Sequence, residues 1–273
     1  MNLKLGIVGA GFVGGSVIEG FDTDTVDQFV VDPLFNDNTI DDLVKYDPPL
    51  LFVCVPTPEA VDDSGDVDVS IARQTLSDLN DLCYKGIVVI KSTITPKHLI
   101  KMKKDFKLNL VYNPEFLTEA NAHADFINPN MQVLGGSWKH CDKVEKAYVR
   151  HSKVKTVPTF KVDLITASLI KYTINSWLAT KVIFMNDLHS LFQQSGSNSS
   201  WEQFTEILQT DPRMGDTHMN VPGPDGKFGF GGHCFPKDTK AFLHYANKLQ
   251  ADLGVLKTAV KLNDKVYRNE NSN

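Results

Sequence analysis

Near its N-terminus the chain reads Leu3-Lys4-Leu5-Gly6-Ile7-Val8-Gly9-Ala10-Gly11-Phe12-Val13-Gly14. The first six residues are an apolar run of strand length that leads directly into three glycines with the spacing of a dinucleotide-binding turn. Gly9 permits a tight turn, Gly11 lets a pyrophosphate approach the backbone, and Gly14 lets the next helix pack on the strand. The stretch therefore predicts a Rossmann-like half that binds a dinucleotide.

A carboxylate further along narrows the choice of cofactor. Asp32 ends a second apolar run, residues 28–32, at about the 20-residue distance where an acid accepts a hydrogen bond from the adenosine ribose. Its charge would repel a 2′-phosphate, so NAD is favoured over NADP. The structural alternative is a turn-forming aspartate before Pro33.

Strand-like and helical segments alternate through the first half. Strands are expected at residues 50–55, 86–91, 108–112 and 131–134, and helical periodicity is clearest at residues 69–82. This alternation predicts an α/β fold with a doubly wound, mostly parallel sheet. Ligands of such sheets bind outside the carboxyl ends of the strands. Polar loops follow three of these ends, although turn formation explains part of their composition: Val55-Pro56-Thr57-Pro58, Lys91-Ser92-Thr93 and Asn113-Pro114-Glu115-Phe116-Leu117-Thr118-Glu119.

The second half is expected to be helical. Residues 162–194 contain no glycine or proline and carry apolar side chains on more than one face, which predicts a long helix buried at a domain or subunit junction. Lys171 and Asn175 are four residues apart and share one face of that helix; a solvated lysine is the alternative for Lys171. We expect an NAD-binding domain over residues 1–158 and a helical central domain over residues 159–273.

A cysteine lies in a second glycine-rich turn, Gly229-Phe230-Gly231-Gly232-His233-Cys234-Phe235-Pro236-Lys237-Asp238-Thr239. The glycines let the backbone approach a ligand, and the start of the predicted helix favours a thiolate. Asp238 falls in the first helical turn, within reach of the sulfur. A buried, inert cysteine beside a helix-supporting acid is the alternative.

Composition excludes several classes of function. The net charge of −5 and the lack of a dense basic cluster argue against nucleic acid and anionic membranes as partners. The N-terminus lacks the regions of a signal peptide, and no run approaches the roughly 18 apolar residues of a membrane span. Since the four cysteines lack close pairing and metal-ligand spacing, we expect a cytoplasmic protein without a metal, His218 and His233 notwithstanding.

Together, these motifs closely resemble the UDP-glucose/GDP-mannose dehydrogenase family over almost the whole chain. The resemblance implies a dimer formed through the central helix and an NAD-dependent four-electron oxidation of the C6 hydroxymethyl group of a nucleotide sugar to a carboxylate. Two NADH would be released, and the product would serve polysaccharide or glycoconjugate synthesis. UDP-glucose, converted to UDP-glucuronate, is preferred only because it is the commonest substrate in the family; UDP-N-acetylmannosamine and GDP-mannose remain open.

By resemblance, Cys234 forms a thiohemiacetal and then a thioester, and Lys171 and Asn175 stabilise oxyanions at C6. Protons pass through water by way of Glu119 and Asp238, with Thr93 positioning the water and Glu115 near it. Which carboxylate serves which step stays open. The cofactor residues implied are Gly9, Gly11, Phe12, Val13, Gly14, Asp32, Val55, Pro56, Thr57, Thr93 and Glu119. The substrate residues implied are Glu115, Phe116, Leu117, Lys171, Asn175, Arg213, Lys227, Phe228 and Gly231, although Arg213 could instead face another subunit.

The sequence departs from the family pattern in two places. The segment between Asp32 and Leu50 is short, and the chain stops after a helix expected at residues 255–267, where family members continue into a second Rossmann-like domain that binds the uridine diphosphate. The sugar nucleotide would then be held by the central region and a partner subunit, the missing domain would come from another chain, or the usual substrate would no longer be turned over. A single-step hydroxy-acid dehydrogenase and a catalytically silent NAD-binding subunit are the competing functions.

Overall fold

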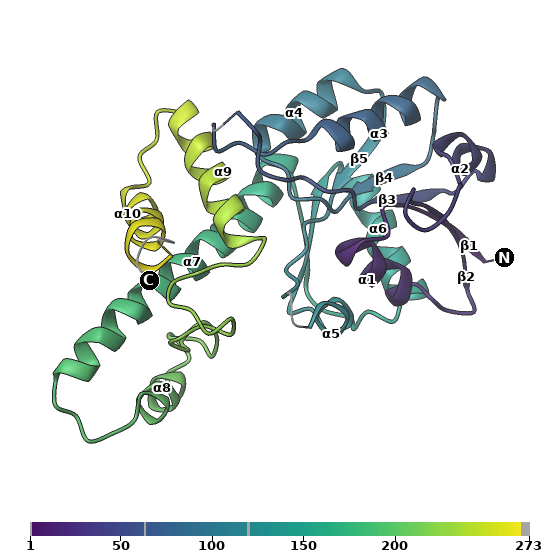
Figure 1. The fold of residues 1–273 in the computed structure, drawn as a ribbon. Helices are drawn as coiled ribbons and strands as arrows, with labels where there is room; N and C mark the ends of the chain where they lie inside the picture. The colour runs from purple at the N-terminus through teal and green to yellow at the C-terminus, as the bar shows by residue number, and fades with distance from the viewer. Residues whose placement is uncertain (1, 63, 119–120, 269–273) are drawn as a thin grey trace. The chain divides into compact units, whose positions relative to one another are not determined.

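The computed structural model describes residues 2–62, 64–118 and 121–268. The chain forms two compact units, one made of Met1–Val61 with Val67–Lys171 and the other of Asp62–Asp66 with Tyr172–Asn273 (Figure 1). The domain boundary expected after residue 158 stays a prediction, and the units divide at Lys171. The physical reason is that a strand beyond residue 158 pairs into the sheet and the start of the long helix packs on it.

The first unit is built on a seven-stranded sheet with the order β2-β1-β3-β4-β5-β6-β7. Neighbouring strands run parallel except β5 and β6, which are antiparallel. The prediction of a mostly parallel, doubly wound sheet is therefore confirmed. The strands are β1 (Leu3–Val8), β2 (Val26–Val31), β3 (Leu50–Val53), β4 (Ile87–Ile90), β5 (Asn109–Tyr112), β6 (Gln132–Gly136) and β7 (Thr159–Val162).

Apolar side chains bury the central strands from both faces. Every residue of β3 and of β4 is buried, as expected for parallel strands that helices cover on each side. Val17 and Val144 belong to the core cluster on one face, together with strand residues such as Phe52. The helices of this unit are α1 (Phe12–Gly20), α2 (Ile40–Tyr46), α3 (Ser70–Asp81), α4 (Pro96–Asp105), α5 (Ala122–Ile127) and α6 (Trp138–His151).

The long helix predicted from the sequence is present as α7 (Leu164–Gln194), which begins in the first unit and continues in the second. The second unit adds α8 (Trp201–Gln209), α9 (Phe235–Lys248) and α10 (Gly254–Leu262). The helix expected at residues 255–267 is α10 followed by a π-helical turn, η1 (Asn263–Tyr267). None of the helices in the described ranges is both long and apolar enough to cross a bilayer.

Candidate active site

The glycine turn between β1 and α1 has the geometry of a phosphate-binding turn. Gly9 adopts a φ of +89°, and a Cβ on Gly14 would lie only 1.8 Å from the carbonyl oxygen of Gly9. A Cβ on Gly11, by contrast, would meet nothing within 4 Å. Phe12 is half-exposed at the start of α1, while Val13 packs against the core. The N-terminus of α1 is therefore open to an anionic group.

The carboxylate of Asp32 accepts hydrogen bonds from the backbone around the glycine turn. Its Oδ2 accepts a hydrogen bond from the N–H of Ala10 at 2.7 Å, and its Oδ1 accepts one from the N–H of Leu34 at 2.8 Å. The turn-forming role of Asp32 is therefore present, while its bond to a ribose stays a prediction, for which each oxygen retains a second lone pair. The open glycine turn and the fixed acceptor fit NAD.

The loops that follow β3 and β4 are tied together. Thr57 donates its hydroxyl to the carbonyl oxygen of Thr93 at 2.9 Å, and Ser92 donates its hydroxyl to that of Val55 at 2.6 Å. Thr57 and Val55 are buried, whereas Pro56 between them is exposed. The sequence expected these residues at the carboxyl edge of the sheet, and two of these loops are joined there by hydrogen bonds.

A buried polar network at this edge was missing from the sequence interpretation. Asn113 accepts hydrogen bonds at its Oδ1 from Lys91 Nζ (3.1 Å) and from the hydroxyl of Tyr148 (2.7 Å), and its amide donates to the carbonyl oxygen of Val133 at 2.9 Å. Burial lowers the pKa of Lys91 to about 8. The network fixes the first residue of the loop that also carries Glu115.

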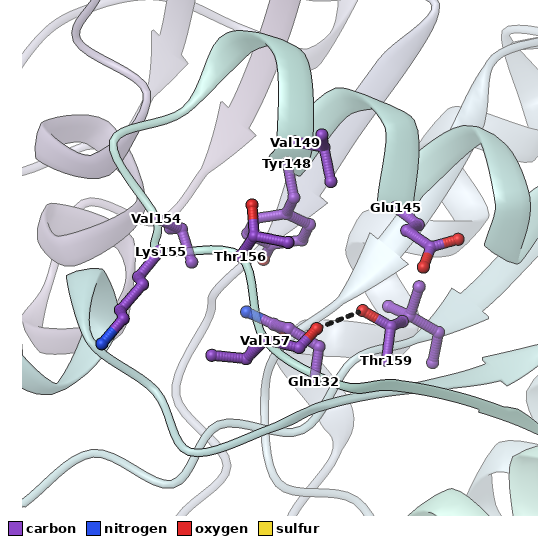
Figure 2. A pocket seen from close by; sticks show the side chains of 10 residues that line it. Gln132, Glu145, Tyr148, Val149, Val154, Lys155, Thr156, Val157 and Thr159 are labelled. Atoms are coloured by element: carbon purple, nitrogen blue, oxygen red, sulfur yellow. Dashed lines mark hydrogen bonds between the residues drawn. The ribbon is translucent and has the colours of Figure 1, made fainter.

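Next to this network, Figure 2 shows a hollow between α6 and the segment that leads into β7. None of the predicted site residues lines it. Gln132 and Tyr148 connect it to the network, because both hydrogen-bond the side chain of Asn113. The remaining lining residues are Leu134, Glu145, Val149, Val154, Lys155, Thr156, Val157 and Thr159.

Lys171 and Glu115 form a buried ion pair. Lys171 Nζ lies 2.6 Å from the carbonyl oxygen of Glu115 and 3.1 Å from its Oε1, while Oε2 accepts a hydrogen bond from the N–H of Leu117. The ring of Phe116 lies 5.6 Å from the ammonium. Burial alone would raise the pKa of Glu115, but the charge of Lys171 and the Leu117 N–H hold it below its usual range. The alternative of a solvated lysine is wrong, since Lys171 is only 2% exposed.

In the second unit, Cys234 is the N-cap residue of α9 and is partly exposed. Its carbonyl oxygen accepts the N–H of Asp238 at 2.9 Å. The carboxylate of Asp238 is buried, and it accepts a hydrogen bond from Asn175 Nδ2 at 2.6 Å and pairs with Lys237 Nζ at 2.6 Å. The thiol is therefore not a buried one, and a fixed carboxylate lies one helical turn from it.

The loop that precedes this cysteine is held by hydrogen bonds from α7 and by contacts between its own residues. Lys181 on α7 donates to the carbonyl oxygens of Met214 (2.8 Å) and Thr217 (2.5 Å), a role that the sequence did not reveal. Arg213 is exposed and pairs with Asp211. Three further substrate predictions lie on the same loop, with Lys227 and Phe228 exposed and Gly231 partly buried. Glu119 lies outside the described residues.

Two family models match the chain. The NAD binding domain of the UDP-glucose/GDP-mannose dehydrogenase family matches residues 45–152, and the central domain of the same family matches residues 165–265. The first unit is accordingly an NAD-binding domain.

Similar proteins and solved structures agree. A UDP-glucose 6-dehydrogenase of Rickettsia felis is 32% identical over 219 residues, which are 78% of this chain and 47% of that protein; one of Rickettsia conorii is 34% identical over 220 residues, 78% and 48% of the two chains. The chain thus spans about half the length of these curated relatives. A UDP-glucose dehydrogenase structure from Pyrobaculum islandicum superposes with a TM-score of 0.82 at 23% identity, covering 96% of this chain and 68% of that one.

A structure of 3-hydroxyisobutyrate dehydrogenase from Mycobacterium tuberculosis shares the fold at 14% identity, with a TM-score of 0.72 and coverage of 96% and 92% of the two chains. Likeness at such identities shows the fold alone. Family assignment depends instead on the two domain models, which between them account for most of the sequence. The chain belongs to the UDP-glucose/GDP-mannose dehydrogenase family.

Proposed function

We propose that the chain is an NAD-dependent nucleotide-sugar 6-dehydrogenase that oxidises an alcohol at C6 to a carboxylate in two steps. The observation that carries the proposal is the partly exposed thiol of Cys234 at the start of α9, one turn from a carboxylate that Asn175 holds. Oxidising an alcohol to a carbonyl needs no covalent nucleophile. Oxidising an aldehyde further does, because its carbon must first become tetrahedral.

The thiol accounts for the second oxidation with atoms and electrons in balance. The sulfur of Cys234 bonds to the aldehyde carbon while the carbonyl π bond opens, and the thiol proton passes to the carbonyl oxygen, which gives a thiohemiacetal. Removal of two electrons and two protons turns this adduct into a thioester, and water then breaks the carbon–sulfur bond to release the carboxylate and restore the thiol. NAD, when bound, supplies the acceptor for two electrons in each oxidation.

The fixed side chains suit the remaining tasks. Asp238 takes one N–H of Asn175, and an amide group carries two, so Asn175 can also donate to a developing oxyanion. Lys171 offers an ammonium for the same purpose. Glu115, ionised beside Lys171, and Asp238 are the described carboxylates that we propose exchange protons with water. Glu119 and Thr93 keep the water-handling roles that the family resemblance implies.

We propose UDP-glucose as the substrate, because the named relatives above are UDP-glucose 6-dehydrogenases. Structures of a UDP-D-ManNAc dehydrogenase from Pyrococcus horikoshii and a GDP-mannose dehydrogenase from Pseudomonas aeruginosa share the fold and keep those sugars as alternatives. We also propose a cytoplasmic location, because the four cysteines form no disulfide, and a product that serves polysaccharide synthesis.

We further propose a homodimer formed through α7. Trp177, Phe184 and Leu191 recur at intervals of seven residues and are 64%, 58% and 63% exposed, so they form an apolar stripe on one face of the helix. A second copy of the chain would cover the stripe. Trp177→Glu should then yield a monomer in sedimentation analysis, whereas Leu249→Glu, at an equally exposed apolar position on another element, should leave the dimer intact.

One experiment tests the function. The purified chain is incubated with NAD and a panel of UDP- and GDP-sugars, and NADH is counted against sugar consumed. Two NADH per sugar with the wild-type chain, and loss of the acid product with Cys234→Ser, support the proposal. A ratio of one would favour a single-step dehydrogenase, the function suggested by the shared fold with 3-hydroxyisobutyrate dehydrogenase. Binding of NAD without turnover would indicate a silent subunit.

A further inference from the structure

The glycine-rich turn that leads to Cys234, residues 229–232, is held by hydrogen bonds with side chains at the C-terminal end of the described chain. We propose that Asn263 and Arg268 are positioning residues that hold this turn, and through it the thiol, in the geometry that the reaction uses. The inference rests on the proposed role of Cys234. It adds a function for the π-helical turn η1, which follows α10.

Two buried side-chain amides grip the backbone of the turn. The N–H of Phe230 donates to Oδ1 of Asn263 at 2.7 Å, and the N–H of Gly229 donates to Oδ1 of Asn186 at 3.0 Å. Asn263 is 2% exposed and Asn186 is 3% exposed. Since a buried N–H without an acceptor is costly, these two amides fix the path of the backbone.

Arg268 grips the same turn on a second side. Its Nη2 donates to the carbonyl oxygen of Gly229 at 3.0 Å, and its Nη1 donates to Oδ2 of Asp225 at 2.6 Å. The guanidinium lies so close to Gly231 that a Cβ there would come within 2.9 Å of Nη1. A Cβ on Gly229 would come within 2.6 Å of Asn263 Oδ1. Both glycines are therefore fitted to these side chains.

The π-helical turn explains how both side chains reach one place. In an α-helix, residues five apart point about 140° away from each other, at 100° per residue. Here the N–H of Arg268 donates to the carbonyl oxygen of Asn263 at 2.8 Å, which closes a five-residue ring and brings Arg268 above Asn263. An uninterrupted α-helix would direct only one of the two side chains at the glycine turn.

The grip extends to the thiol through a short and doubly anchored segment. Phe230 packs in an apolar cluster with Ile183 and Ala259, and its ring meets that of Phe235 edge to face at 6.4 Å. Cys234 lies between these anchored phenylalanines, after Gly232 with its φ of +75°. Displacing Phe230 would therefore displace the segment that carries the thiol.

The test compares the alkylation of two cysteines within the full chain. Iodoacetamide is added in limiting amount, and peptides that contain Cys234 and Cys83 are quantified by mass spectrometry. Cys83 is exposed in the first unit and serves as the internal reference, while Cys54 and Cys141 are buried. The variants are Asn263→Leu and Arg268→Gln. Tyr267→Phe is the matched control, because it removes a hydrogen bond to Asp187 from the same turn without removing the Cβ that faces Gly229.

Loss of the hydrogen bonds that Asn263 or Arg268 makes to the turn should loosen it and expose the half-buried thiol, raising the ratio of Cys234 to Cys83 alkylation about tenfold in Asn263→Leu and Arg268→Gln. Amide hydrogen exchange at residues 229–235 should accelerate in both variants. Tyr267→Phe should change neither measurement. In the sugar assay, kcat should fall while KM for NAD stays unchanged, because NAD is assigned to the first unit.

A ratio and an exchange pattern in the two variants equal to those of Tyr267→Phe would overturn the proposal. Arg268→Gln carries the test alone if Asn263→Leu does not fold. The alkylation ratio needs no sugar substrate. If Cys234→Ser retained full formation of the acid, the proposed function would fail while the grip on the turn would still be measured.

Discussion

The two units each hold a carboxylate against a residue of α7, but they do so with different chemistry. In the first unit, Lys171 and Glu115 are a fully charged pair, 2% and 7% exposed. In the second, Asp238 accepts a hydrogen bond from the neutral amide of Asn175. The pair in the first unit therefore balances charge. The contact in the second unit orients a carboxylate whose charge is balanced by another residue, Lys237.

Breaking the charged pair should have the largest effect on stability. Lys171→Met leaves Glu115 buried without its counter-charge, and we expect the free energy of unfolding to fall by about 3–5 kcal/mol. Urea unfolding measures the change. The double variant Lys171→Met/Glu115→Gln removes both charges and should recover part of the loss. No recovery in the double variant would contradict the account of a pair held together by charge.

Breaking the neutral contact should cost less. Asn175→Leu removes a hydrogen bond to a carboxylate, and we expect a loss of about 1–3 kcal/mol in the same assay. Asn175→Asp is a sharper test, because it places a second carboxylate beside Asp238, and two carboxylates at such a short distance do not both ionise easily. That variant should lose stability as the pH rises from 4 to 8, a trend that Asn175→Leu should not share.

The dependence of stability on pH should distinguish the two regions further. The pKa of Glu115 is lowered in the folded chain, so the unfolded chain binds the proton more readily. The contribution of the pair is therefore present above the unfolded pKa of about 4.3 and is lost as the pH falls through the folded value. Unfolding measured from pH 3 to 6 should show a slope that is flatter in Glu115→Gln. An unchanged slope would argue against the pair.

The last effect, expected from Lys91 at the carboxyl edge of the sheet, is confined to alkaline pH. Its pKa is lowered to about 8, so between pH 8 and about 10.4, the ordinary lysine value, the unfolded chain binds more protons than the folded chain. Stability should accordingly rise with pH across this window in the wild type. Lys91→Met should abolish the rise, because it replaces the titratable amine with an apolar side chain of similar length. Unfolding curves of the wild type and of Lys91→Met, recorded at pH 8 and at pH 10, measure this change in stability.

Local patterns predicted the elements and residues whose signals lie within a few positions. The glycine turn and the strand Leu3–Val8 appear with the predicted bounds. Strand β7 was missed because Thr159 and Lys161 interrupt its apolar residues, so it lacks the continuous apolar run that marked the buried strands. The long helix showed itself by length and composition, although the change of unit at Lys171 leaves no mark in that pattern.

The site was predictable in part for the same reason. Turns and helix positions pointed to Cys234, Lys171 and Asn175 as residues, but not to the contacts of the last two, because Glu115 lies 56 residues from Lys171 and Asp238 lies 63 residues from Asn175. Tyr148 and Arg268 depend on partners that lie 35 and 39 residues away, and no local pattern records such pairs. The π-helical turn likewise follows an ordinary amphipathic helix, and its sequence contains no proline or glycine that would indicate a change of helix type.

The continuity of α7 restricts how this gene can change length. Each residue added between Lys171 and Asn175 would turn everything beyond it by about 100° and shift it by 1.5 Å, so that Asn175 would no longer share a face with Lys171. A three-nucleotide insertion at this point should therefore be removed by selection. The same insertion between α7 and α8, where residues 195–200 are exposed, should persist. Length variation among natural relatives is expected to collect in that loop and to spare the helix.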